Sequence, residues 1–166
     1  MNIHLTFCDV PGYEYDISGA RNAGYTTEFD YDASDLTPLS PIGSKPFQQE
    51  LLDGTMFELK KRHRYKQAFT TNPDLALNGI NMTVVSYDES TGAITKTKAV
   101  WSIHDLLTAW AMARSRWITT PFNLSQNVPL TDIKVVLKSP DLTIAKHDNA
   151  LIMEKTTIEF ETAQSY

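Results

Sequence analysis

Charged side chains at alternating positions are the first residues in this sequence whose types and spacing could do chemistry. Glu28, Asp30 and Asp32 are two residues apart, so on a β-strand their carboxylates share one face. Such a face can bind a divalent cation or take part in acid–base work. A strand face that simply meets water explains the same pattern, and we favour that interpretation. The sequence therefore predicts an exposed acidic face here.

A basic run over residues 60–66 is the densest charge feature. Its cations are Lys60, Lys61, Arg62, Arg64 and Lys66. Such a run can meet phosphate or an acidic surface on another chain. Tyr65 is its one interleaved aromatic residue, and the chain has a net charge of −5, so its whole surface is not suited to nucleic acid. The run predicts contact with a protein partner, without sequence-specific nucleic-acid binding.

The sequence shows no spacing typical of a catalytic or metal site beside the acidic face and the basic run. The four histidines are far apart in the sequence and outside the usual zinc-ligand spacings. Residues 19–24 have the glycines of a phosphate loop but lack its lysine. Cys8 is the single cysteine, which excludes an intrachain disulfide. We expect no catalytic residue, no metal and no cofactor, so not an enzyme; an enzyme site assembled from distant residues stays open.

Composition predicts one globular domain over residues 1–166. Apolar residues make up 42% of the chain and charged residues 21%, close to the averages of globular proteins. No stretch of eighteen apolar residues occurs, and the first residues do not have the pattern of a cleaved signal. We therefore expect no membrane span and a reducing, cytoplasmic environment.

Alternation of apolar and polar residues predicts the strands of this domain, including the one that carries the acidic face. It runs over residues 3–8 and 25–32, and the clearest hairpin joins residues 80–87 to 93–101 through the turn at 88–92. Further strands are expected over residues 133–138, 142–145 and 151–162. Strands dominate this order, which favours a sandwich or barrel over alternating βαβ units.

One helix is expected over residues 102–117. Ser102 is a good N-cap, and Asp105 three positions later completes an acidic capping box. An apolar stripe follows, formed by Ile103, Leu106, Leu107, Trp110, Ala113 and Trp117. The predicted fold class is thus mainly β, a β-sandwich or β-barrel, with one packed α-helix near 102–117.

Long irregular connections are expected near 33–46 and 119–131, where prolines gather. The segment 47–66 is open to two interpretations. Its Gln, Glu, Leu and Lys residues favour a helix, whereas Asp53 and Gly54 favour a turn that interrupts it. We expect a short helix or turn over 47–52 and then a strand over 56–66.

The order of these elements resembles the tail-tube family of contractile phage tails, their type VI secretion counterparts and related baseplate proteins. The resemblance lies in the hairpin over residues 80–101, the helix over 102–117 and the closing strand over 156–161. It implies a structural subunit of a virion tail or baseplate, located in the virion and assembled in the host cytoplasm.

The resemblance also implies partners and surfaces. Tube-like proteins form homo-oligomeric rings by extending β-sheets across subunits, and they contact other structural proteins of the same assembly. They present acid to a lumen through which DNA slides, a role that Glu28, Asp30 and Asp32 would fill. The basic run would then face an acidic neighbour.

A ligand-binding β-sandwich of the carbohydrate-binding type is the alternative. Aromatic rings stack on sugars, and the candidates are Tyr13, Tyr15, Tyr25 and Tyr31. Tyrosines at strand spacing are more often ordinary sheet packing. We therefore favour the assembly subunit.

Overall fold

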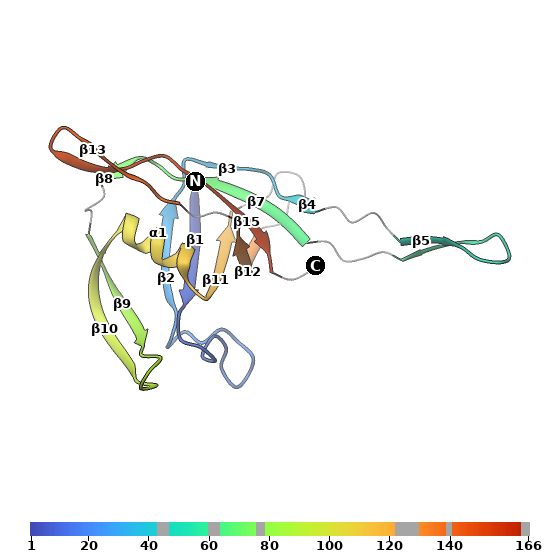
Figure 1. Ribbon diagram of the computed structural model, residues 1–166, viewed down its shortest axis with the longest axis horizontal. Helices are drawn as coiled ribbons and strands as arrows, with labels where there is room; N and C mark the ends of the chain where they lie inside the picture. Colours follow the sequence, from blue (N-terminus) through green and yellow to red (C-terminus); the bar gives the residue numbers. More distant parts are fainter. Residues whose placement is uncertain (43–46, 60–63, 76–78, 122–129, 139–140, 164–166) are drawn as a thin grey trace.

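The computed structural model describes residues 1–42, 47–59, 64–75, 79–121, 130–138 and 141–163. Within these ranges the chain is mainly antiparallel β-structure with one α-helix, as the sequence predicted. A thin hairpin projects from one end of the body, and the body itself holds the helix and the other strands (Figure 1).

The body is built on one eight-stranded sheet with the order β2-β1-β11-β12-β15-β7-β3, in which β4 also pairs with β7. Its strands are β1 (Asn2–Cys8), β2 (Thr27–Asp32), β3 (Asp35–Leu36), β4 (Ser40–Ile42), β7 (Arg64–Thr70), β11 (Ser115–Thr120), β12 (Leu130–Leu137) and β15 (Thr157–Thr162). At its centre, Leu5 of β1 lies opposite Phe29 of β2 and Ile118 of β11. All three side chains are buried, so this register places the apolar faces of the strands in the core.

Three smaller sheets surround this one. Their strands are β5 (Phe47–Glu50) with β6 (Met56–Leu59), β9 (Gly79–Tyr87) with β10 (Ile94–Ser102), and β13 (Ile144–His147) with β14 (Ala150–Met153) and β8 (Asp74–Leu75). The β9–β10 hairpin is the one predicted from the sequence, and it lies beside the helix (Figure 1).

The helix, α1 (Ile103–Met112), covers the core. Ser102 caps it, because its side-chain oxygen accepts a hydrogen bond from the backbone N–H of Asp105 at 3.0 Å. Leu106, Leu107 and Trp110 are fully buried, and the indole of Trp110 donates to the backbone oxygen of Trp117 at 3.2 Å. Burying one such side chain contributes about 1.5–3 kcal/mol, so α1 is a main clamp on the sheet.

The helix ends five residues earlier than predicted. Ala113 has an extended backbone with ψ 153°, and the chain enters β11 at Ser115. Trp117 and Ile118 pair there with Thr6 and Leu5 of β1. Sheet pairing and burial therefore outweigh the helical spacing of the apolar residues in this stretch.

Three other expectations about elements need correction. A helix or turn over 47–52 was wrong for residues 47–50, which form β5 and pair with β6, although the turn at Asp53 and Gly54 is present. The single strand over 151–162 is two strands, β14 and β15. The connection near 33–46 contains β3 and β4, and both pair with β7. The connection near 119–131 lies largely in residues outside those described.

No described helix combines the length and apolar character that crossing a bilayer requires.

Candidate functional site

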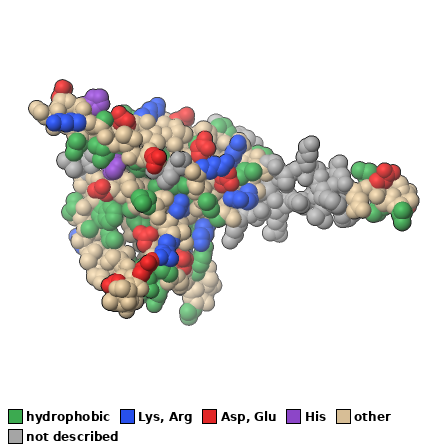
Figure 2. All heavy atoms as spheres, viewed as in Figure 1, with side chains coloured by type: hydrophobic (Ala, Val, Ile, Leu, Met, Phe, Trp, Pro, Cys, Tyr) green, Lys and Arg blue, Asp and Glu red, His purple; other side chains and the backbone are tan. Residues whose placement is uncertain are grey.

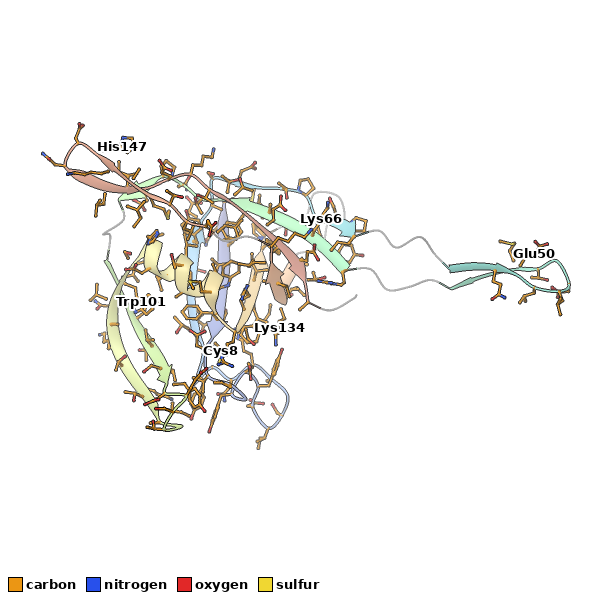
Figure 3. All side chains as sticks on the ribbon, in the orientation of Figure 1. Cys8, Glu50, Lys66, Trp101, Lys134 and His147 are labelled. Atoms are coloured by element: carbon orange, nitrogen blue, oxygen red, sulfur yellow. The ribbon has the colours of Figure 1, made fainter. Side chains whose placement is uncertain are left out.

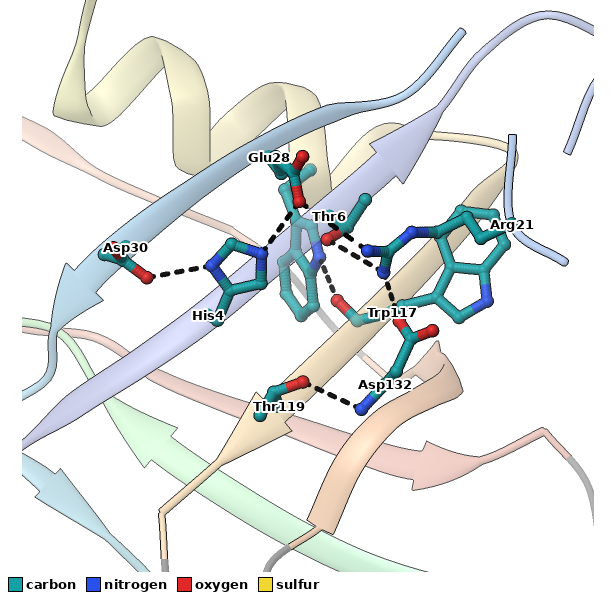
Figure 4. A network of polar contacts seen from close by, with 9 residues as sticks. His4, Thr6, Arg21, Glu28, Asp30, Trp117, Thr119 and Asp132 are labelled. Atoms are coloured by element: carbon teal, nitrogen blue, oxygen red, sulfur yellow. Dashed lines mark hydrogen bonds and ion pairs between the residues drawn. The ribbon is translucent and has the colours of Figure 1, made fainter. Parts of the chain in front are cut away.

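The acidic face lies on β2, as predicted. Buried and exposed residues alternate along this strand, and Glu28, Asp30 and Asp32 are its exposed members. Because β2 pairs with β1, His4 stands between two of the carboxylates: its Nδ1 lies 2.8 Å from Asp30 and its Nε2 lies 3.1 Å from Glu28 (Figure 4). Asp32 contacts the α-amino nitrogen of Met1. The carboxylates of this face are therefore partnered.

An arginine extends this network towards β12. Arg21 lies 3.6 Å from the carboxylate of Glu28, donates to the hydroxyl of Thr6 at 3.3 Å and contacts Asp132 (Figure 4). The backbone N–H of Asp132 donates in turn to the hydroxyl of Thr119 at 2.7 Å. These contacts join β2, β1, β11 and β12 on one side of the sheet, so the network fixes the loop that carries Arg21 on its strands.

The acidic face lacks the arrangement that a metal ion needs. Among the described residues, no group of three or more His, Cys, Asp or Glu side chains could hold a cation. Both ring nitrogens of His4 already face a carboxylate. The nearby hydroxyl of Thr6 accepts a hydrogen bond from Arg21. The network has the contacts of a structural brace.

The basic run is described only in part, because Lys60, Lys61 and Arg62 lie outside the described residues. Arg64 donates to the carboxylate of Glu161 at 3.1 Å and to the backbone oxygen of Thr162 at 2.9 Å. Lys138 contacts the other oxygen of Glu161 at 2.7 Å. This hydrogen bond lowers the pKa of Glu161 and raises the pKa of Lys138. Arg64 is thus engaged within the body.

Lys66, the remaining cation of the run, lines a pocket of about 260 Å³ over β4, β7 and β15. Gln67 is 4% exposed in its wall and donates to the backbone oxygen of Thr37 at 2.8 Å. Lys138 and Glu161 line the same pocket and pair with each other. The pocket walls are therefore mostly held by contacts within the chain.

The projecting hairpin, which we call the arm, consists of β5, β6 and their connecting turn, residues 47–59. β5 and β6 pair with each other, and the turn is held by a hydrogen bond from the N–H of Leu51 to the oxygen of Thr55 at 2.8 Å. Leu51, Leu52 and Met56 are 46%, 111% and 59% exposed. The arm stands apart from the body and carries hydrophobic and acidic side chains (Figure 2).

Sequence reasoning did not identify the arm as a site. Its signal was present in the adjacent Leu51 and Leu52 beside the Asp53–Gly54 turn, because two leucines next to a reverse turn have no obvious place in a core. Gly54 has φ +78°, which suits glycine, and the side chain of Asp53 accepts from the N–H of Thr55 at 2.9 Å.

A second apolar surface lies between β10 and α1. This α1–β10 groove has a volume of about 460 Å³ and is lined by Ala99, Val100, Trp101, Asp105, Thr108, Ala109 and Met112. Val100 and Met112 are 71% and 77% exposed. Large apolar side chains at such exposure flank the groove from a strand and a helix, so it is an apolar surface open to solvent.

The four tyrosines of the carbohydrate-binding alternative do not form one exposed row. Tyr31 is 5% exposed, and its hydroxyl accepts from the N–H of Asn72 at 2.8 Å. Tyr13 packs on Tyr25 with ring centroids 4.5 Å apart. Lysine ammonium groups lie over the rings of Tyr15 and Tyr25. These contacts are those of sheet packing, and they occupy ring faces that a sugar would need.

Cys8 is buried at 1% exposure, and burial raises the pKa of its thiol. A protonated, enclosed thiol is a poor nucleophile, so Cys8 is a core residue of this fold.

Comparison of the chain with protein-family models, with curated proteins and with solved structures found no match.

Proposed function

We propose that this chain is a structural subunit of a virion tail or baseplate assembly, working through contacts and strand pairing between subunits. The arm is the observation that supports this proposal. It places apolar side chains at the end of a two-stranded hairpin, outside the core of its own chain. Its location would be the virion, after assembly in the host cytoplasm.

An isolated two-stranded hairpin is at best marginally stable in water. Each strand of a two-stranded sheet also has one unpaired edge, which is a template for pairing with another chain. Exposed Leu51, Leu52 and Met56 add apolar surface to those edges. Contact with a second subunit would pair the free strand edges and bury the apolar side chains.

The charged surfaces fit the same proposal. In a ring of copies, the face that carries Glu28, Asp30 and Asp32 would line a lumen, where these partnered carboxylates would still present oxygen atoms to a passing nucleic acid. Lys66 lies on the side of the body that is nearer the arm (Figure 3), where it would meet an acidic neighbour. No step of the proposal requires catalysis or a cofactor.

The test is the state of assembly of the full chain. We expect purified protein to form oligomers of defined mass by size-exclusion chromatography with light scattering, and rings or short tubes by electron microscopy. The triple variant Leu51→Ser, Leu52→Ser, Met56→Ser should be monomeric, because it removes the apolar contact of the arm while leaving the body intact.

A matched control replaces exposed apolar residues elsewhere. Ile144 and Leu151 are 41% and 44% exposed on β13 and β14, and the double variant Ile144→Ser, Leu151→Ser should assemble like the parent. Parent protein that stays monomeric up to millimolar concentration would overturn the proposal. Equal assembly of the parent and the triple arm variant would show that the arm is not the contact between subunits.

A further inference from the structure

The pocket over β4, β7 and β15 is large enough to hold a small molecule. It has a volume of about 260 Å³, and its lining includes residues 66–68 of β7 and 159–161 of β15. An apolar cavity of roughly 150 Å³ accepts benzene. The pocket therefore has room for a molecule about the size of an amino acid.

Two lysines and two glutamates line this pocket, and only some of them pair with each other. Glu161 lies 2.7 Å from Lys138 and 3.1 Å from Arg64, so its carboxylate is neutralised within the chain. Lys66 and Glu159 are both exposed. Among the described residues, these two charges form no direct ion pair, which leaves the pocket one ammonium and one carboxylate for a ligand.

The register of β7 and β15 places these two charges around a small residue. Ala68 lies opposite Glu159, and Lys66 lies opposite Glu161. Lys66 and Ala68 are two residues apart on β7, so they share one face of the sheet with their partners on β15. Because Ala68 contributes only a methyl group to the lining, the space between Lys66 and Glu159 is left open.

Gln67 adds a hydrogen-bond acceptor to the lining. Its Nε2 donates to the backbone oxygen of Thr37 at 2.8 Å, and Thr37 is fixed in turn because its hydroxyl accepts from the N–H of Ala68 at 2.9 Å. The Oε1 of Gln67 is buried and has no hydrogen-bond partner in the part of the chain that the structure describes. Such an acceptor favours a ligand that brings an N–H group.

We infer that this pocket binds a small zwitterion of the α-amino-acid class. The carboxylate of the ligand meets Lys66, and its ammonium group meets Glu159 and brings N–H donors to Gln67. Hydrogen bonds between charged groups are roughly twice as strong as neutral ones, so a ligand with both charges gains over one with a single charge. The inference goes beyond the proposed function and does not depend on it, because the pocket lies within a single copy.

Ligand-observed NMR tests this inference on the full chain. Saturation-transfer difference spectra are recorded with each of the standard L-amino acids, and the dissociation constant of every one that binds is measured by titration. We expect at least one to bind in the millimolar range or more tightly. Its N-acetyl derivative lacks the ammonium group and its carboxamide lacks the carboxylate, so each should bind at least ~10-fold more weakly.

Two charge-removing variants locate the site. Lys66→Gln and Glu159→Gln keep the approximate size of exposed side chains, and each should weaken binding at least ~3-fold. Lys98→Gln and Glu154→Gln are the matched controls, because Lys98 and Glu154 are exposed and do not line the pocket. Both controls should bind like the parent, and circular dichroism establishes that each variant is folded.

The inference would be overturned if no amino acid bound at millimolar concentration. It would also fail if the N-acetyl derivative bound as well as its parent, since the pocket would then recognise a carboxylate alone, as at the end of a peptide. Unchanged affinity in both Lys66→Gln and Glu159→Gln would place the binding elsewhere. None of these results bears on the assembly measured with the triple arm variant, so the two proposals can fail separately.

Discussion

The body and the arm of this chain contain similar apolar residues in opposite circumstances. In the body, Leu106, Leu107 and Trp110 are completely buried between α1 and the large sheet. In the arm, Leu51 and Leu52 face water beside a turn. The apolar residues of the body therefore stabilise its own fold, whereas those of the arm are exposed to solvent. The following predictions test this contrast, beginning with the change that should affect stability most.

Trp110→Ala should have the largest effect on the body. It opens a cavity among buried residues such as Phe69, whose ring centroid lies 5.9 Å from that of Trp110. We expect the free energy of unfolding to fall by about 3–5 kcal/mol, measured by urea denaturation. Met112→Ala is the control on the same helix, and because Met112 is 77% exposed it should change stability by less than ~0.5 kcal/mol. Similar losses for both would contradict the role of α1 as a clamp.

Ser102→Ala should have an intermediate effect. It removes the hydroxyl that accepts the N–H of Asp105 and leaves a helix N-terminus without its cap. A loss of about 1 kcal/mol in the free energy of unfolding is expected, seen as a lower melting temperature. Ser102→Asp keeps an acceptor in that place and should retain most of the stability. A Ser102→Ala protein as stable as the parent would show that packing alone sets the start of α1.

Glu161→Gln should change how the stability of the body depends on pH. The hydrogen bond with Lys138 holds the pKa of Glu161 below its ordinary value of 4.5 in the folded state. The ionised carboxylate therefore stabilises the fold fully above that ordinary value, and this stabilisation is lost as the pH falls through the lowered pKa. Denaturation curves of the variant should vary less with pH on the acid side than those of the parent.

Lys138→Gln should reduce the acid-side pH dependence in part, because it removes one of the two cations that contact Glu161. A parent and a Glu161→Gln protein with parallel acid-side profiles would assign the acid sensitivity to other carboxyls.

The triple arm variant should have the smallest effect on the body. Leu51, Leu52 and Met56 are exposed, so replacing all three with serine should change the free energy of unfolding of the monomer by less than ~0.5 kcal/mol. Hydrogen exchange gives an independent measurement: amides of β5 and β6 should exchange faster than those of β1 and β11. Slow exchange in the arm of a monomer would show that the arm is stabilised within its own chain.

The sequence was informative where one local pattern had one structural outcome. The β9–β10 hairpin followed from its β-branched residues and its turn, and the start of α1 followed from Ser102 and Asp105. The end of α1 did not, because Trp117 fits a helical stripe and also fits a strand. Pairing with β1, more than a hundred residues earlier, decides between them.

The surfaces show the same division. Alternation alone placed Glu28, Asp30 and Asp32 on one face, but the position of His4 between two of them depends on the pairing of β1 with β2. The α1–β10 groove arises only when α1 packs beside β10, so no local pattern contains it. The arm was missed because Gln48, Gln49 and Glu50 locally favour a helix. In the structure these residues belong to β5, and their pairing with β6 outweighs that local preference.

The attachment of the arm has a mechanical consequence. Along the chain the arm lies between β4 and β7, which pair with each other through Ile42 opposite Arg64 and Ser40 opposite Lys66. β7 is joined in turn to β15 along five residue pairs. A force directed along β7 would act on all five pairs of this ladder together, so its hydrogen bonds would share the load. The β7–β15 ladder would therefore resist a pull on the arm by shear.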